Sequence, residues 1–166
     1  RLLDAGAEGI IIPHVDGLEG AKKAVDAVRY PPLGHRGAAA GTRAARFGSV
    51  PWDEHVAQSN QEVLLSVMCE DDRGLDAMEE IAALDGIDLV AIGPTDFSES
   101  MGIRDPSDPR LRTKLNQLAA KVKRIGKAKL QFPTDHPALP LSAKELVGLG
   151  AGYTHVAPAP PAVLLR

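Results

Sequence analysis

The chain lacks the features of secreted, membrane-spanning or nucleic-acid-binding proteins. Its single cysteine, Cys69, cannot form an internal disulfide, which favours a reducing compartment such as the cytoplasm. No stretch approaches the roughly 20 uninterrupted apolar residues that cross a bilayer. The net charge of -3 supplies no broad positive field for a phosphate backbone. We therefore expect neither a membrane nor a nucleic acid as a partner.

Apolar residues are nevertheless abundant enough for a packed core. They make up 44% of the 166 residues, which is typical of one domain or part of a larger one. The chain begins with Arg1, and residues 2–6 read like the end of a helix. We expect residues 1–166 to be a single incomplete domain whose N-terminal elements are missing.

Short apolar runs alternate with amphipathic segments along the chain. The runs at 9–13, 63–68, 89–92, 128–132 and 153–157 predict five strands. Helices between successive strands imply right-handed crossovers and a parallel sheet, so the fold class is α/β. The pattern alone does not separate a barrel from an open doubly wound sheet. Neither type of glycine-rich phosphate loop is present, which removes the main support for nucleotide binding.

Capping signals indicate where the helices begin and end. Asp16 and Glu19 form a predicted capping box before the first helix, and Pro31-Pro32 ends that helix. A helix with Leu75, Met78, Ile81 and Ala82 on one face follows Glu70. A regular amphipathic helix over 111–125 stops at Gly126, and a helix capped by Ser142 and Glu145 closes at Gly150.

Two segments are predicted to be loops. Residues 93–109 read as a long loop after the third strand. Residues 31–60 carry no strong strand signal and suggest a structured loop with a helical turn that contains Arg43 and Arg46. Long loops of this kind often carry function.

Two acids follow neighbouring strands and form a candidate metal site. Side chains alternate along a strand, so Met68 and Glu70 share one face of the second strand. Asp96 follows the next strand, where its carboxylate could converge with that of Glu70. Two carboxylates suit hard divalent ions such as Mg²⁺ and Mn²⁺. Helix capping is the competing explanation, and Asp71 and Asp72 are alternative acids that we expect to lie at a solvated helix start.

Other polar side chains are weaker candidates. Arg36 lies between glycines in a loop, where its guanidinium could reach a carboxylate. His14 ends the first strand without a paired ligand, a position more typical of a structural or exposed histidine, so we do not assign it to the site. Cys69 is expected to pack against a helix as a small apolar side chain rather than to act as a nucleophile.

Several motifs together resemble the HpcH/HpaI aldolase and citrate lyase family. The similarity covers nearly the whole chain, and the combination of a Tyr-Pro-Pro and Arg-Gly loop with a Gly-Pro-x-Asp-x-Ser turn is specific. The segments that carry it are 3–7, 29–32, 34–37, 43–48, Glu70 with 74–75, 92–98 and 101–102.

This resemblance implies a partial (β/α)8 TIM barrel, of which the chain supplies strands four to eight. It implies that Glu70 and Asp96 hold Mg²⁺, Mn²⁺ or Co²⁺, which pyruvate chelates, while the backbone around Thr95 binds the pyruvate carboxylate. The implied reaction is reversible cleavage of a 4-hydroxy-2-oxo acid to pyruvate, or an analogue, and an aldehyde. The family's general-base histidine and active-site arginine belong to strands before Arg1, and a homo-oligomer is expected.

Departures from the family leave two alternatives open. Met68 stands beside the substrate where relatives usually have Gln, Arg36 matches a later loop near the site mouth, and 157–160 replace a glycine-containing strand end. Arg36 is therefore given only a loop or substrate-contact role. The alternatives are a citrate-lyase-like enzyme acting on a coenzyme A thioester and a non-catalytic barrel homologue. The isolated chain is expected to be inactive.

Overall fold

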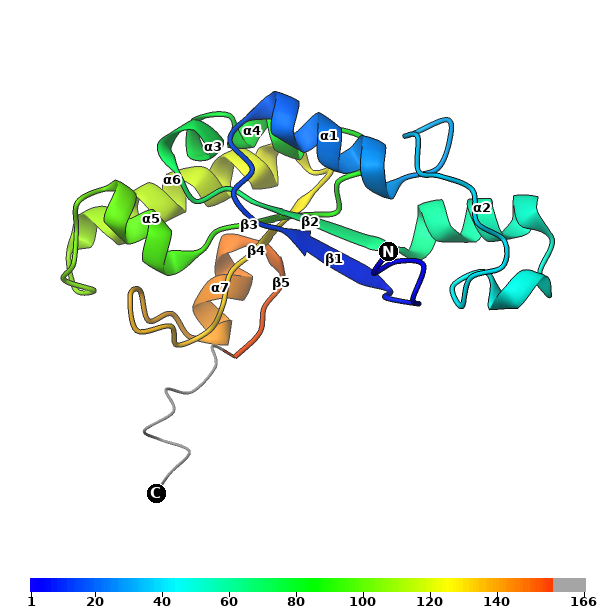
Figure 1. Ribbon diagram of the computed structural model, residues 1–166. Coiled ribbons are helices and arrows are strands. Elements are labelled where there is room, and N and C mark those ends of the chain that lie inside the picture. Colours follow the sequence, from blue (N-terminus) through cyan, green and yellow to red (C-terminus); the bar gives the residue numbers. More distant parts are fainter. Residues whose placement is uncertain (157–166) are drawn as a thin grey trace, which may run out of the picture.

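A computed structural model describes residues 1–156 as helices packed against a five-stranded parallel sheet (Figure 1). The strands lie in chain order: β1 (Gly9–Ile12), β2 (Leu64–Met68), β3 (Leu89–Ala91), β4 (Lys129–Gln131) and β5 (Ala151–Tyr153). The predicted α/β class and five parallel strands are confirmed. The last strand begins two residues earlier than predicted, and Ala157 at its predicted end lies outside the described residues.

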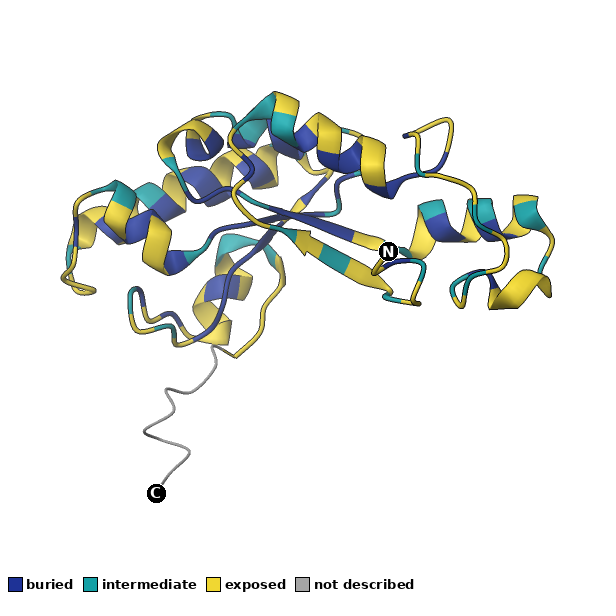
Figure 2. Cartoon of the chain, in the orientation of Figure 1, coloured by how far each residue is buried: buried dark blue, intermediate teal, exposed yellow. Residues whose placement is uncertain are grey.

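Helices connect the strands and cover the sheet. Helices α1 (Leu18–Val28), α4 (Met78–Ala82) and α6 (Pro109–Ile125) lie side by side on one face, where they bury the main apolar core (Figures 1 and 2). The remaining helices are α2 (Trp52–Glu62), α3 (Asp72–Asp76), α5 (Pro94–Ser100), α7 (Ala143–Leu149) and the 3-10 turn η1 (Arg46–Gly48). Within the part that the structure describes, no helix is long and apolar enough to cross a membrane.

The ends of α6 and α7 follow their sequence signals. Helix α6 stops at Gly126, whose φ of 74° is the left-handed conformation that glycine adopts without steric cost. Helix α7 begins with the predicted capping box, in which the Glu145 N–H donates to the Ser142 hydroxyl and the Ser142 N–H donates to the Glu145 carboxylate. These two boundaries are confirmed.

The capping box predicted for the first helix is wrong. Helix α1 begins after Gly17, whose φ of 127° only glycine adopts readily, and no side chain caps it. Asp16 instead lies 3.4 Å from Arg73, and Glu19 pairs with Lys22 at 2.6 Å. The left-handed turn at Gly17 moves the helix start one residue beyond the position from which Asp16 could cap it.

The two segments predicted to be loops contain helices that were not predicted from the sequence. Helix α5 interrupts the predicted loop at 93–109 and begins with Pro94, whose fixed φ suits the first helical position. Helix α2 occupies part of 31–60 beside η1, and it begins after Pro51 without a side-chain cap. The helix predicted after Glu70 is divided at Ala77 into α3 and α4. Each of these helices is short or lacks the signal that identifies a boundary.

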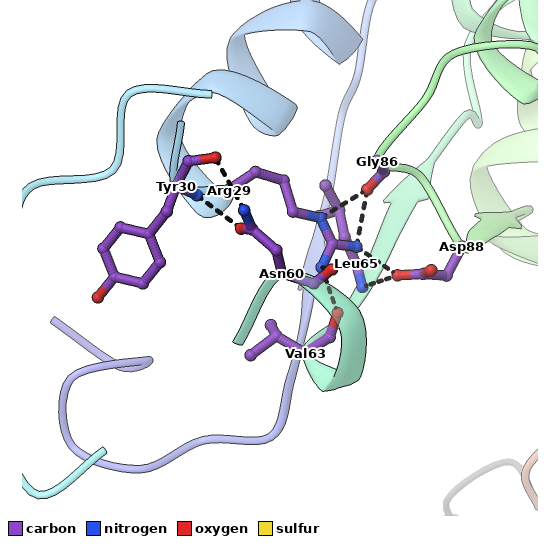
Figure 3. A network of polar contacts seen from close by, with 7 residues as sticks. All are labelled: Arg29, Tyr30, Asn60, Val63, Leu65, Gly86 and Asp88. Carbon is purple, nitrogen blue, oxygen red and sulfur yellow. Dashed lines mark hydrogen bonds and ion pairs between the residues drawn. The ribbon is translucent and has the colours of Figure 1, made fainter. Parts of the chain in front are cut away.

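A buried arginine ties the C-terminal end of α1 to the amino ends of β2 and β3 (Figure 3). The Arg29 side chain is 2% exposed, and all five of its N–H groups have acceptors: the carbonyls of Asn60, Val63 and Gly86, with Gly86 accepting twice, and the Asp88 carboxylate at 2.6 Å. The same Asp88 oxygen accepts the Leu65 N–H at 2.7 Å. Arg29 therefore fixes β2 beside β3.

We predict that Arg29→Met lowers the free energy of unfolding by about 2 kcal/mol, because it leaves three partly buried carbonyls without this donor and removes the positive charge beside Asp88, which keeps the hydrogen bond from the Leu65 N–H. Arg110→Met is the matched control, since Arg110 is exposed and its ion pair within residues 1–156 is with the nearby Asp108, so the free energy of unfolding should stay nearly unchanged. Urea unfolding measures both. Equal effects of the two substitutions would contradict a special role for Arg29.

Candidate active site

The carboxyl ends of three neighbouring strands bring His14, Glu70 and Asp96 together. The register pairs Ile12 with Val67 and Met68 with Ala91, so β1, β2 and β3 end at the same edge of the sheet. Polar groups at this edge are the usual reactive groups of parallel α/β folds. The arrangement places Glu70 between the other two side chains.

Glu70 is a buried carboxylate, with 4% of its surface exposed. Its Oε1 accepts the backbone N–H of His14 at 3.1 Å and lies 3.0 Å from Nδ1 of the His14 ring. Burial raises the pKa of Glu70 above its ordinary value, the hydrogen bond and charge of His14 oppose that rise, and the neighbouring Asp96 adds to it. The folded protein therefore disfavours the ionised form of Glu70.

Asp96 lies in the first turn of α5, exposed to solvent. It is near enough to Glu70 to raise the pKa of that carboxyl group, both through its negative charge and through hydrogen bonding between the two carboxyl groups when one is protonated. The structure therefore brings the two predicted acids together. Two carboxylates that repel one another at one edge attract a cation.

Gly93 and Met68 complete the surroundings of Glu70. A Cβ atom added at Gly93 would lie 2.3 Å from Oε2 of Glu70 and 3.4 Å from the Met68 sulfur. Only glycine leaves room for the carboxylate there. The proximity also confirms that Met68 and Glu70 share one face of β2, as the alternation predicts. Val67 and Cys69 point instead into the core beneath the helices.

The remaining candidates are separated by their positions. Thr95 lies beside Asp96 in the first turn of α5, where helix N–H groups lack intrahelical acceptors. Asp71 caps α3 by accepting the Gly74 N–H at 2.7 Å, which confirms helix capping for this acid. Burial raises the pKa of the Cys69 thiol to about 12, which makes it a poor nucleophile.

Arg36 lies at the opposite end of the sheet. Its guanidinium donates to Asp4 at 2.8 Å and to Ser59 at 3.3 Å, and it lies over the Tyr30 ring. Asp4 precedes β1 and Ser59 belongs to the helix before β2, so both contacts lie at the amino ends of the strands. Arg36 therefore does not reach the two acids within this chain. It lines a cavity of about 530 Å³ together with Glu8, Arg43, Arg46, Gln58 and Glu62.

A divalent ion at the acidic pair would have two protein ligands. Among residues 1–156, no three His, Cys, Asp or Glu side chains gather into a metal-binding cluster. Mg²⁺ and similar ions are commonly held by one or two carboxylates, with water and substrate oxygens completing the coordination. The buried Glu70 and the exposed Asp96 fit this description, because one side of the pair faces solvent.

Polar groups at the carboxyl edge of a parallel sheet are typical of α/β enzyme sites, and sequence comparison identifies the family. The model of the HpcH/HpaI aldolase/citrate lyase family matches residues 1–134. The chain belongs to this family. It is 42% identical over 127 residues to the hydroxypyruvate/pyruvate aldolase of Sagittula stellata, covering 76% of this chain and 49% of that protein.

Two further similarities agree with the family. The chain is 36% identical over 158 residues to a 2-keto-3-deoxy-L-rhamnonate aldolase of Klebsiella pneumoniae, covering 94% of this chain and 57% of that protein. The crystal structure of an HpcH/HpaI aldolase from Desulfitobacterium hafniense superposes with a TM-score of 0.83 at 28% identity, over 99% of this chain and 62% of the other. The chain spans about half the length of these curated relatives, and its sheet is part of a TIM-like barrel.

We predict that Glu70→Gln raises the thermal unfolding midpoint of the metal-free protein at pH 7 by a few °C. A carboxyl group whose pKa is raised on folding stabilises the fold fully below its unfolded pKa near 4.5, and that contribution is lost as pH rises through the higher folded value. At pH 7 the amide removes this penalty and its oxygen can still accept the His14 N–H. The difference should vanish near pH 4.

The measurement is a thermal melt with chelator present at pH 7 and pH 4. Glu8→Gln serves as the control, because Glu8 is a solvent-exposed glutamate directly before β1 and should show no comparable gain. A lower midpoint for Glu70→Gln at pH 7 would mean that the carboxylate stabilises the fold rather than burdening it.

Proposed function

We propose that the protein containing this chain is a metal-dependent aldolase that reversibly cleaves a 4-hydroxy-2-oxo acid to pyruvate, or a close analogue, and an aldehyde. The observation that carries the proposal is the closeness of the Glu70 and Asp96 carboxyl groups at the carboxyl edge of the sheet. The names of the relatives, a hydroxypyruvate/pyruvate aldolase and a 2-keto-3-deoxy-L-rhamnonate aldolase, support a 2-oxo acid as the substrate class.

In this proposal Glu70 and Asp96 hold Mg²⁺, Mn²⁺ or Co²⁺. Such an ion supplies Lewis acidity, which stabilises the negative charge that develops on a keto oxygen when a carbon–carbon bond breaks. Burial, to which the charge of Asp96 adds, raises the pKa of Glu70 without metal, and the same two negative charges would attract a cation. The burial of Glu70 restricts access of competing water to that side of the site.

Other residues of the chain would bind and orient the substrate. The backbone N–H groups of Thr95 and Asp96, which lie in the first turn of α5, would donate to the substrate carboxylate. Met68 lies on the same face as Glu70 and would present an apolar surface to the substrate carbon chain. Arg36 is assigned no substrate contact, because its guanidinium is paired with Asp4.

The proposal extends to the complete protein. A general-base histidine and an arginine from strands before Arg1 would complete the site, so residues 1–166 alone are expected to release no pyruvate. A homo-oligomer in the cytoplasm is part of the same proposal. The family includes citrate lyases as well as aldolases, but the relatives with 36% and 42% identity carry aldolase names, which favours aldol cleavage.

We predict that Glu70→Gln in the full-length protein lowers pyruvate release from 4-hydroxy-2-oxo acids by roughly 10²-fold or more, because the charge stabilisation that the ion provides is lost. A chelator should abolish release by the unmodified enzyme, and added Mn²⁺ should restore it. The assay couples pyruvate to lactate dehydrogenase and follows NADH.

The neighbouring acid Asp71 provides the control. Asp71→Asn keeps a side-chain acceptor for the Gly74 N–H and should leave both stability and pyruvate release nearly unchanged. Full activity in Glu70→Gln, or activity that chelation does not reduce, would rule out the proposed role of the acidic pair.

A further inference from the structure

His14 has a backbone conformation that a histidine rarely adopts. Its φ is 52°, in the left-handed region, and it is one of four non-glycine residues with positive φ among residues 1–156. It directly follows Pro13 at the carboxyl end of β1, and the next N–H, that of Val15, donates to the Met68 carbonyl of β2 at 3.0 Å. Such strained residues persist only where surrounding contacts compensate for them, and they concentrate at functional sites.

The compensating contacts are both made with Glu70. The backbone N–H of His14 donates to Oε1 at 3.1 Å, and ring Nδ1 lies 3.0 Å from the same oxygen, so the tautomer with hydrogen on Nδ1 donates there as well. The left-handed turn is what lets one residue direct its main-chain and side-chain donors at a single oxygen. Two donors occupy Oε1, which leaves Oε2 as the freer oxygen of Glu70.

Oε2 occupies the space beside Gly93. It lies 2.3 Å from the point where a Cβ atom would stand on Gly93, in space that any other residue would fill. Gly93 immediately precedes α5, which carries Asp96. The carboxylate therefore lies between His14, whose donors contact Oε1, and Gly93, which leaves room for Oε2 and immediately precedes the helix that carries the second acid.

Core packing does not account for the His14 side chain. The ring is 73% exposed, whereas the carboxylate it contacts is 4% exposed. Because the ring is in solvent, it contributes little buried apolar surface to the fold, although its partner Glu70 is buried. Partners that orient a metal ligand act differently, because their removal weakens metal binding about 10- to 100-fold while the fold persists.

We propose that His14 is a positioning residue that orients Glu70 for cation binding, with Oε1 held by the histidine and Oε2 presented to the ion. This inference rests on the proposed function, since it assumes that Glu70 is a metal ligand. It assigns a role to a residue outside the acidic pair and to its ring in particular, because the backbone N–H is present whatever side chain stands at position 14.

The test measures Mn²⁺ binding to the full-length protein by the loss of the free-ion signal in electron paramagnetic resonance. His14→Gly keeps the left-handed backbone and the N–H but removes the ring donor. His14→Asn also tolerates this conformation and supplies a side-chain N–H close to where Nδ1 lies. We expect His14→Gly to weaken Mn²⁺ binding about tenfold and His14→Asn to stay within about threefold of the unmodified protein.

Glu70→Gln and a thermal melt of each metal-free variant separate the possible outcomes. If Glu70→Gln loses Mn²⁺ binding while His14→Gly binds as tightly as the unmodified protein, or while His14→Asn is as weak as His14→Gly, the positioning role is overturned and the metal site stands. If Glu70→Gln binds Mn²⁺ as tightly as the unmodified protein, the metal site itself fails and the role of His14 fails with it. Unchanged melting temperatures, with rescue by His14→Asn, are the supporting result.

Discussion

A carboxylate withdrawn from water must find donors or a counter-charge, and this requirement at Glu70 organises the edge of the sheet. Its side chain is 4% exposed, yet within residues 1–156 its hydrogen-bond donors come from His14 alone, while Asp96 adds repulsion. A divalent ion bound between the two carboxylates would offset both the burial of Glu70 and the repulsion by Asp96. The strained turn at His14 and the absence of a side chain at Gly93 are both consequences of accommodating this one group.

The geometry at the carboxyl edge depends on interactions at the amino edge. Arg29 and Asp88 fix the starts of β2 and β3 through the Val63 carbonyl and the Leu65 N–H (Figure 3). Because strands of three to five residues allow little slippage once one end is fixed, the register carries through to Glu70 and Gly93. A residue remote from the acids thus determines whether they converge, which connects stability of the sheet to the proposed chemistry.

The strands and the face on which Glu70 lies could be predicted from periodicity, and Asp96 could be predicted because the carboxyl ends of neighbouring parallel strands share an edge. Alternation along β2 places Met68 and Glu70 on one face and leaves Cys69 in the core, as the structure shows. Helix α6 could also be predicted from the sequence, because its regular apolar stripe ends at a glycine. The failures lie where the pattern is short or the backbone unusual. Helix α5 has seven residues, and the capping box at Asp16 was displaced by the left-handed Gly17.

His14 and Arg36 show why side-chain roles were harder to predict than strands. The sequence favoured Arg36, a charged residue in the Gly34-His35-Arg36-Gly37 loop, over His14, which lacks a paired ligand. Their contacts depend on the three-dimensional structure. At His14, a positive φ directs the backbone and ring donors toward Glu70. At Arg36, the chain before β1 brings Asp4 within hydrogen-bond distance of the guanidinium. Only Pro13-His14 at a strand end hinted at the first, and nothing local hinted at the second. A residue that acts through another residue's carboxylate needs no ligand spacing of its own, so motif spacing cannot detect it.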